Sequence, residues 1–301
     1  MGMTTNSWLH KYALALACCT LFLVVAGASV TSTESSLSVP DWPLSYGQIV
    51  PEMKGGVFFE TGHRLVAKAV GFLVIILAIW MWKKEDRPWM RKVGWYALGM
   101  VCLQGLLGGL TVLFLLPKPV SISHACLAQL FFSLTCAIAL WTSPGWKQGP
   151  ELVADGGTPS MRTLSWFTPL SVLVQIALGA GFRHKAINVI PHIAGALVVT
   201  GIIMYVAIAV IVQYPKHRPL KNAAIALLSI TTMQVFLGIA AYISRLATAD
   251  SLTPVTSMVW FTVVHVAVGG LTMASSVILA IQIRRNVVPA TETAPQKLAL
   301  V

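Results

Sequence analysis

Eight long apolar segments constrain the fold of this chain more than any other feature of its sequence. Each has about 20 or more residues, enough for a helix to cross ~30 Å of hydrocarbon. They cover approximately residues 12–31, 58–82, 93–116, 121–142, 164–183, 190–213, 222–245 and 256–283. The chain is 56% hydrophobic and only 10% charged, a balance that excludes an ordinary soluble domain. We therefore predict an all-α integral membrane protein with eight transmembrane helices.

The first segment has a second interpretation. Ala26, Gly27 and Ala28 supply the small residues of a signal-peptide cleavage site. The apolar stretch is too long for a signal peptide, and the repeat described below needs it as a helix. We expect a transmembrane helix here.

The positions of the basic residues predict the topology. Most of the 21 lysines and arginines lie near the ends of the chain or in the connections after the second, fourth and sixth segments. By the positive-inside rule, both termini and these connections lie in the cytoplasm. The net charge of +11 therefore reflects orientation in the membrane, and we expect no nucleic-acid partner.

The sequence divides into two similar halves. A stretch rich in glycine and proline separates them, which gives an N-terminal four-helix bundle at 1–143, a cytoplasmic linker at 144–163 and a C-terminal four-helix bundle at 164–301. In each half the order is histidine, Gln-x-x-Leu-Gly, histidine, with 41 residues from His63 to Gln104 and 42 from His192 to Gln234. This pattern indicates two tandem bundles from an internal duplication.

Four histidines lie within apolar segments, toward the outer ends of alternate helices. They are His63, His124, His192 and His265. Any one of them is explained by hydrogen bonding at the membrane interface, but a repeated set indicates ligands. Zinc needs donors that converge on one tetrahedral point, and copper often adds sulfur, whereas two imidazoles on facing helices suit the axial positions of a heme iron. We expect His63 to pair with His124, and His192 with His265.

The two expected heme sites differ in their surroundings. Glu60 precedes His63 by three residues and so shares its helix face, where a carboxylate can hold a proton or stabilise positive charge. Its alternative role is that of an acid favoured at a helix N-terminus. No acid precedes His192, and the outer connection is long in the first half (32–57) but short in the second (183–191). We expect one reactive site and one that carries electrons.

Basic residues near the histidines are candidates for binding heme propionates. They are Arg64, Lys68, Arg183 and Lys185. Ordinary snorkelling of long side chains to the membrane surface explains them equally well. The many helical glycines have two explanations as well, since close packing of helices in lipid and room for a flat macrocycle both require small residues.

The chain resembles the bacterial heme A synthase family of cytochrome oxidase assembly. The resemblance rests on residues 42–47, 59–64, 104–109, 123–124 and 179–184 and on the two later histidines. It implies oxidation of the C8 methyl group of heme o to a formyl group, which gives heme A. It also implies that His63, His124 and Glu60 form the substrate site, while His192 and His265 hold a heme b cofactor.

The resemblance also implies a setting and partners. The setting is the bacterial inner membrane, with both heme sites toward its outer face. The partners are heme o, an electron donor of unknown identity, and further candidates in heme o synthase, cytochrome oxidase subunit I and a second copy of the chain. Many family members carry a cysteine pair in the first outer loop. Here residues 31–57 contain none, since Cys18, Cys19, Cys102, Cys126 and Cys136 all lie within apolar segments.

Two other functions fit the same four histidines. A diheme membrane cytochrome b relays electrons without modifying heme, and in such a protein Glu60 has no chemical role. A heme-handling assembly factor or transporter holds heme loosely and releases it unchanged. The chemical equipment expected around His63 favours the enzyme.

Overall fold

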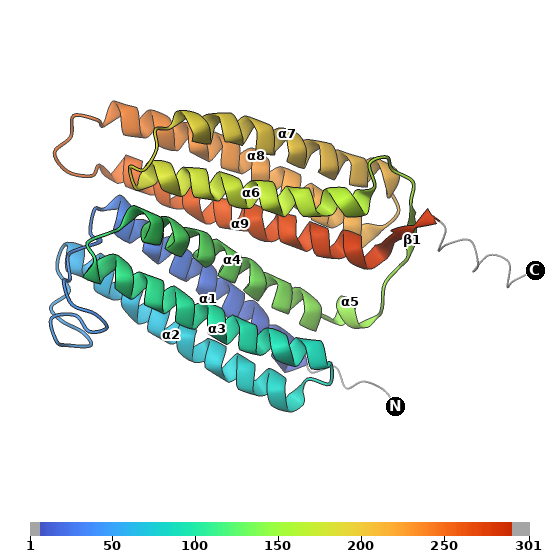
Figure 1. Cartoon of the computed structure of the whole chain (residues 1–301), viewed down its shortest axis with the longest axis horizontal. Coiled ribbons are helices and arrows are strands. Elements are labelled where there is room, and N and C mark those ends of the chain that lie inside the picture. Colours follow the sequence, from blue (N-terminus) through green and yellow to red (C-terminus); the bar gives the residue numbers. More distant parts are fainter. Residues whose placement is uncertain (1–6, 291–301) are drawn as a thin grey trace, which may run out of the picture.

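The structure, a computed structural model that describes residues 7–290, consists almost entirely of long helices (Figure 1). Residues 1–6 and 291–301, the ends of the two expected halves, lie outside it. Within the described part, eight helices are long and apolar enough to cross a membrane. They are α1 (Ser7–Ser32), α2 (Gly56–Lys84), α3 (Pro88–Leu113), α4 (Lys118–Thr142), α6 (Met161–Arg183), α7 (Ile190–Gln213), α8 (Arg218–Ala247) and α9 (Thr256–Asn286). The predicted set of eight is confirmed, with ends that differ by a few residues.

The eight helices form two rings of four. In the first ring α1 and α3 each pack against both α2 and α4, and in the second α6 and α8 each pack against both α7 and α9. Helices α2 and α4 therefore lie diagonally across the first ring, as α7 and α9 do across the second. The order of packing is the same in both halves. The origin of this likeness in a duplication remains an interpretation.

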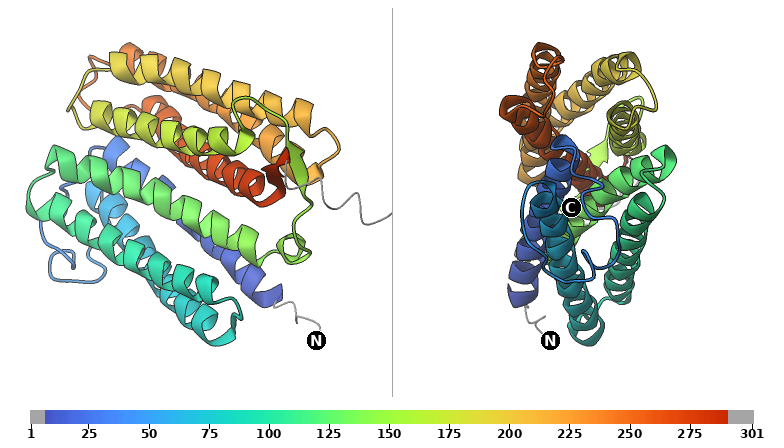
Figure 2. Two further views of the ribbon diagram at one scale, coloured as in Figure 1. Left: turned by 45° about the vertical axis from the view of Figure 1, so that its right-hand side comes forward. Right: turned by 90° about the vertical axis from the view of Figure 1, so that its left-hand side faces the viewer.

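The two rings pack side by side along α4 and α9, as two views of the molecule show (Figure 2). Helix α1 also contacts α9, and α6 also contacts α4, so the contacts correspond when the halves are exchanged. Val24, Phe132 and Ala274 form a small buried cluster at this junction. Such a seam couples the two bundles into one body.

The connection between the halves carries short regular elements. Residues 144–163 contain α5 (Pro144–Lys147) and β1 (Val153–Asp155), and β1 pairs in parallel with β2 (Val287–Pro289) after α9. Asp155 accepts hydrogen bonds from the backbone N–H group of Gly157 and from those of Met161 and Arg162 at the start of α6. The expected linker is thus fastened to the end of the second bundle.

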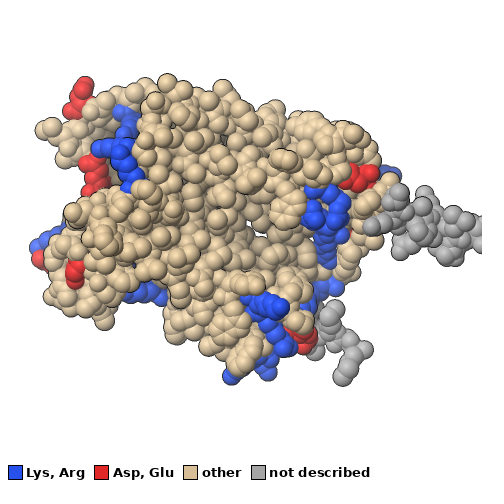
Figure 3. All heavy atoms as spheres, viewed as in Figure 1, with Lys and Arg blue, Asp and Glu red and all other residues tan. Residues whose placement is uncertain are grey.

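The helices run between two ends of the molecule, which we call the terminal end and the loop end. Helix α1 begins and α9 ends at the terminal end, and the long connection after α1 lies at the opposite, loop end (Figure 1). In the space-filling view, basic side chains gather toward both ends and a broad band without charge lies between them (Figure 3). This band and the eight apolar helices make the chain a multi-pass membrane protein.

The apolar core of each bundle occupies the half nearer the terminal end. In the second bundle the buried residues of α7 run from Ile203 to Val210, and those of α8 from Leu220 to Thr231. In the first bundle the core of α1 lies between Leu9 and Leu16. The half nearer the loop end, which holds the histidines, is packed differently.

Candidate functional site

The four histidines lie in two pairs, one across each ring. His63 is on α2 and His124 on the diagonal helix α4, while His192 is on α7 and His265 on the diagonal helix α9. The imidazoles of His192 and His265 are 6.3 Å apart between ring centres, with planes at 86°. The imidazoles of His63 and His124 are close enough to interact electrostatically. The structure thus brings together the pairs expected from the sequence.

Each imidazole packs against a glycine of a neighbouring helix. A Cβ atom added to Gly27, Gly108, Gly179 or Gly238 would lie 3.0, 3.3, 2.8 or 2.9 Å from the Cε1 atom of His63, His124, His192 or His265, respectively. Three of these distances are at or below the closest approach of real Cβ atoms, so any larger residue would push the ring aside. The glycines therefore fix where each ring can lie.

Three of the four imidazoles also contact a glutamine amide. The Nε2 atom of Gln175 is 3.0 Å from His192 Nδ1 and donates to the His192 carbonyl at 2.7 Å. Gln104 makes the corresponding contacts with His124, at 3.3 Å to Nε2 and 3.0 Å to the carbonyl. Gln234 is 3.5 Å from His265 Nε2, at the limit of a hydrogen bond. The repeated Gln-x-x-Leu-Gly motif thus has a structural meaning, since its glutamine and glycine both contact a histidine.

These surroundings fit heme ligation. Nδ1 atoms of His63, His124 and His265 are buried without a hydrogen-bond partner, which is costly unless another group binds there. A metal–imidazole bond of ~2 Å on each side of one ion puts two ring centres about 6 Å apart, which matches the His192–His265 separation. No group of three or more His, Cys, Asp or Glu residues converges anywhere in residues 7–290, so the donor set suits two axial ligands better than a tetrahedral ion.

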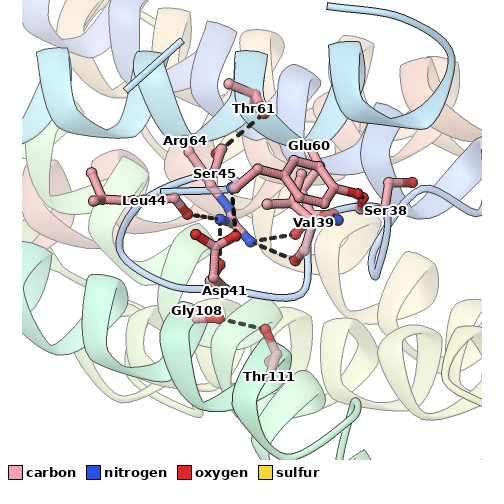
Figure 4. Close-up of polar contacts among 11 residues, drawn as sticks. Ser38, Val39, Asp41, Leu44, Ser45, Glu60, Thr61, Arg64, Gly108 and Thr111 are labelled. Atoms are coloured by element: carbon pink, nitrogen blue, oxygen red, sulfur yellow. Dashed lines mark hydrogen bonds and ion pairs between the residues drawn. The ribbon is translucent and has the colours of Figure 1, made fainter. Parts of the chain in front are cut away.

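Glu60 lies at the loop end of α2, where the connection after α1 folds over the first bundle (Figure 4). Its side chain is only 4% exposed. The carboxylate accepts a hydrogen bond from the Val39 backbone N–H at 2.9 Å and one from Arg64, one helical turn on, at 2.6 Å. The two donors hold this buried carboxylate in one position.

The Arg64 guanidinium is the centre of this loop contact. Besides Glu60, it donates to the backbone carbonyls of Val39, Asp41 and Leu44 at 3.1, 2.7 and 2.6 Å (Figure 4). These bonds tie residues 39–44 to α2. Arg64, a candidate for binding a propionate, thus forms hydrogen bonds with the protein itself.

The loop is also folded on itself around Asp41. Its two carboxylate oxygens accept hydrogen bonds from the backbone N–H groups of Tyr46 at 2.7 Å and Gly47 at 2.8 Å. The N–H groups of Gly47 and Tyr46 hold the pKa of Asp41 below its usual range, because they bind the charged form. The Asp41 carboxylate therefore stabilises a tight turn within the loop.

The loop rests on α3 beside the first histidine pair. A Cβ atom on Gly109 would lie 2.8 Å from the indole of Trp42, so the ring sits directly on the helix backbone. The preceding residue, Gly108, contacts His124. Trp42 therefore links the loop to the helix that positions an imidazole, a contact that sequence reasoning missed.

The other expected cations have different surroundings. Arg183 donates to the Ser32 hydroxyl at 2.7 Å and is close enough to His265 to interact electrostatically. Lys185 is exposed after α6, and Lys68 is exposed along α2. No hydrogen bond or ion pair of either lysine side chain is found among the described residues. Of the four candidate cations, Arg183 alone both interacts with one of the four imidazoles and forms no ion pair with an acid among the described residues.

Arg245 is a further cation of the second site that the sequence did not single out. Its guanidinium lies 5.1 Å from the centre of the Phe182 ring, and it is close enough to Arg183 for the two charges to repel. Within residues 7–290 neither arginine forms an ion pair with an acid. Two uncompensated cations at the loop end of the second bundle favour an anionic ligand.

The five cysteines are all unpaired thiols on helices, as expected from their positions in the apolar segments. Two of them, Cys18 and Cys102, are exposed on the helix surface. The loop over the first bundle is therefore held by Arg64, Glu60 and Asp41, and not by a disulfide.

The sequence is similar to a known protein family and to several curated bacterial proteins. A model of the cytochrome oxidase assembly protein family, COX15-CtaA, matches residues 10–189, which include Glu60, His63 and His124. The heme A synthase of Shouchella clausii is 39% identical over 170 residues, 54% of this chain and 55% of the relative. That of Symbiobacterium thermophilum is 28% identical over 181 residues, 58% and 59% of the two chains. That of Chelativorans sp. is 29% identical over 229 residues, 61% and 60%.

The match thus spans about half to three fifths of the length of these curated relatives. The family model covers almost all of the first bundle, its loop and α6, and it ends before His192. Because that model accounts for more than half of the sequence, the chain belongs to the COX15-CtaA family of cytochrome oxidase assembly proteins.

Proposed function

We propose that this protein is a heme A synthase, which oxidises the C8 methyl group of heme o to a formyl group. The observation that carries the proposal is the pairing of four imidazoles across two helix rings, with a buried Glu60 beside only one pair. The relatives named heme A synthase support it over the part of their length that aligns.

The first bundle is the proposed substrate site. His63 and His124 would hold heme o and, after reaction, heme A. Glu60, one turn before His63, is held in place beside the ligand by Val39 and Arg64. A fixed carboxylate at this place stabilises positive charge that develops on the substrate and accepts its proton. The loop that Arg64 and Trp42 fasten over the bundle keeps water from the reacting group.

The second bundle is the proposed cofactor site. His192 and His265 hold heme b, and when bound this heme supplies one-electron transfer between the donor and the substrate site. Arg183 and Arg245, both without an acidic partner in the described chain, bind its propionates. Lys68 in the first bundle and Lys185 in the second are further propionate candidates that contribute by charge, and Arg64 is a candidate that also holds the loop.

The proposed setting is the inner membrane of a bacterium, with the terminal end in the cytoplasm and the loop end outside. The excess of lysine and arginine in the connections of the terminal end supports this orientation. Both heme sites then lie toward the outer face. Heme o synthase, cytochrome oxidase subunit I, an electron donor and a second copy of the chain are the proposed partners.

The experiment that tests the function is pigment analysis after turnover. The protein is produced in aerated cells together with heme o, and the extracted hemes are identified by mass. We expect a heme that carries a C8 formyl group, absent when the Glu60→Ala variant is produced instead. Recovery of only unmodified heme o and heme b from well-folded protein overturns the proposal and leaves a membrane cytochrome that relays electrons.

A further inference from the structure

A groove at the terminal end of the second bundle lies where α6 begins and α9 ends. It has a volume of about 410 Å³, and its lining residues are Ser160, Arg162, Thr163, Trp166, Phe167 and Arg284. The lining thus combines two guanidinium groups and two hydroxyls with two aromatic rings, and it contains no acid. Positive charge and hydrogen-bond donors lie here beside apolar surface, a combination that suits an amphipathic ligand with an anionic head.

The two guanidinium groups of the groove have no acidic partner within residues 7–290. Arg162 donates through Nη1 to the backbone carbonyls of Arg284 and Val287, at 3.3 and 2.6 Å, which holds its side chain against the end of α9. The Arg284 guanidinium lies 5.1 Å from the centre of the Trp166 ring, a contact that uses its charge but none of its N–H groups. Both arginines therefore keep N–H donors for an anion.

The hydroxyls of Ser160 and Thr163 supply one more donor. The Ser160 oxygen accepts a hydrogen bond from the Thr163 backbone N–H at 3.1 Å, and the two hydroxyls share a bond of 2.8 Å. Each hydroxyl has one proton, so one O–H is used between them and the other is left to donate. The carboxylate of Asp155, the acid nearest to Arg162 in sequence, accepts from backbone N–H groups instead. A phosphate group, which is anionic and accepts several hydrogen bonds, fits these donors.

An apolar stripe continues from the groove along the surface of α6. Trp166, Leu170 and Val174 are 59%, 58% and 53% exposed, and their spacing of four residues puts them in one slanting row. Arg162 lies four residues before Trp166 and begins this row. A tryptophan between charged and aliphatic side chains is typical of the boundary between water and lipid. A free phosphate ion would use only the charged end of the row, whereas a lipid would use all of it.

The first bundle has no such arrangement at the same end. Helices α1 and α4 occupy the places in the first ring that α6 and α9 occupy in the second. Near the start of α1, Lys11 Nζ lies 4.9 Å from the centre of the Trp8 ring. The last turn of α4 carries no basic residue, whereas that of α9 carries Arg284 and Arg285. Lys11 is therefore a matched control, a cation beside a tryptophan without a second cation from the neighbouring helix.

We propose that the groove binds the phosphate of an anionic phospholipid, with Arg162 and Arg284 as its hydrogen-bond donors. One acyl chain of the lipid lies along the row of Trp166, Leu170 and Val174. A zwitterionic lipid has the same phosphate, but its ammonium group offsets the negative charge that the guanidinium groups attract. The groove should therefore prefer a lipid with net negative charge. Bound there, the lipid joins the start of α6 to the end of α9.

Native mass spectrometry of the full-length protein, purified in detergent and freed of lipid, tests this proposal. The protein is mixed with phosphatidylglycerol or with phosphatidylcholine of the same acyl chains, and the lipid retained is identified by its mass. We expect phosphatidylglycerol to be retained at about tenfold lower concentration, and Arg284→Gln to remove this preference, the effect of one charge-assisted hydrogen bond. Lys11→Gln should leave the preference unchanged. Equal retention of the two lipids by the wild type, or an equal loss in both variants, overturns the proposal.

Inorganic phosphate separates a lipid site from a site for a free anion. We expect millimolar phosphate to leave the retention of phosphatidylglycerol unchanged, because the ion lacks the apolar contacts. Displacement of the lipid by phosphate would instead assign the groove to a free anion and overturn the choice of lipid.

Thermal unfolding of the wild type gives a second measurement that needs no variant. Phosphatidylglycerol should raise the unfolding temperature more than phosphatidylcholine does, since a ligand stabilises the state that binds it. The difference should vanish in about 1 M salt, which screens exposed charges beyond ~3 Å. A difference that persists in high salt contradicts recognition by the two arginines.

Discussion

Glu60 and Arg64, one turn apart on α2, form a buried ion pair of 2.6 Å, and both bind Val39 of the loop that follows α1. Their side chains are only 4% and 10% exposed, so little water screens the interaction. The same carboxylate that lies beside the first histidine pair is thus part of the attachment of the loop. The residue that we propose for the chemistry thus also helps to hold the loop.

Replacing Glu60 by glutamine should separate these two roles. Glutamine keeps the size of the side chain and an acceptor for Val39 N–H, but it removes the negative charge next to Arg64. We expect formation of the C8-formyl heme to fall by about a hundredfold or more, the scale of a lost acid–base group, while the heme absorption spectrum is kept. Glu52→Gln, at an exposed loop carboxylate that pairs with Lys54, is the matched control. Undiminished product formation in Glu60→Gln would leave the carboxylate with a structural role alone.

Gly109→Ala should dislodge the loop from α3. Alanine in the middle of a helix is normally about 0.5–1 kcal/mol better than glycine, and Gly105→Ala, where the new Cβ meets no atom within 4 Å, should show that gain in thermal unfolding. At Gly109 the Cβ would lie 2.8 Å from the Trp42 indole, so the gain should be absent or reversed. Adding Trp42→Ala to Gly109→Ala should restore it, and a penalty that persists without the indole contradicts the contact.

The helices and the histidine pairs could be predicted from the sequence because each depends on local pattern. An apolar segment of sufficient length forms a transmembrane helix whatever its neighbours are, and the repeat then orders the helices. The pairing of His192 with His265 followed from their places in that repeat, and their rings lie 6.3 Å apart. Whether they ligate iron remains a proposal.

The surroundings of Arg64 could not be predicted in the same way. Its partners Val39, Asp41 and Leu44 lie 20 to 25 residues before it, in a loop without periodicity, so no pattern shows which backbone carbonyls it meets. Arg245 was missed for a related reason, since its approach to Phe182 depends on how the ends of α8 and α6 lie relative to each other in the ring.

Gly179→Ala should disturb the second heme site alone. A Cβ atom there would lie 2.8 Å from His192 Cε1, which forces the ring out of its position. We expect the purified variant to lose about half of its low-spin heme absorption, because one of two sites fails, while the first site remains loaded. The control is Gly201→Ala on α7, where the added atom meets nothing within 4 Å. Loss of both hemes together would mean that the two sites are not independent.

The turn around Asp41 should survive moderate acid. Backbone N–H groups of Gly47 and Tyr46 lower the pKa of Asp41 in the folded loop, so the carboxylate stabilises the turn fully above the ordinary aspartate pKa of about 4. That contribution is lost only as the pH falls through the lower folded value, where protonation removes the acceptor. Limited proteolysis of residues 33–55 across this range should show protection down to below pH 4, followed by cleavage. In Asp41→Asn, which does not titrate, cleavage should be faster at neutral pH and show no such step. A wild-type loop that opens near pH 6 would place the responsible group elsewhere.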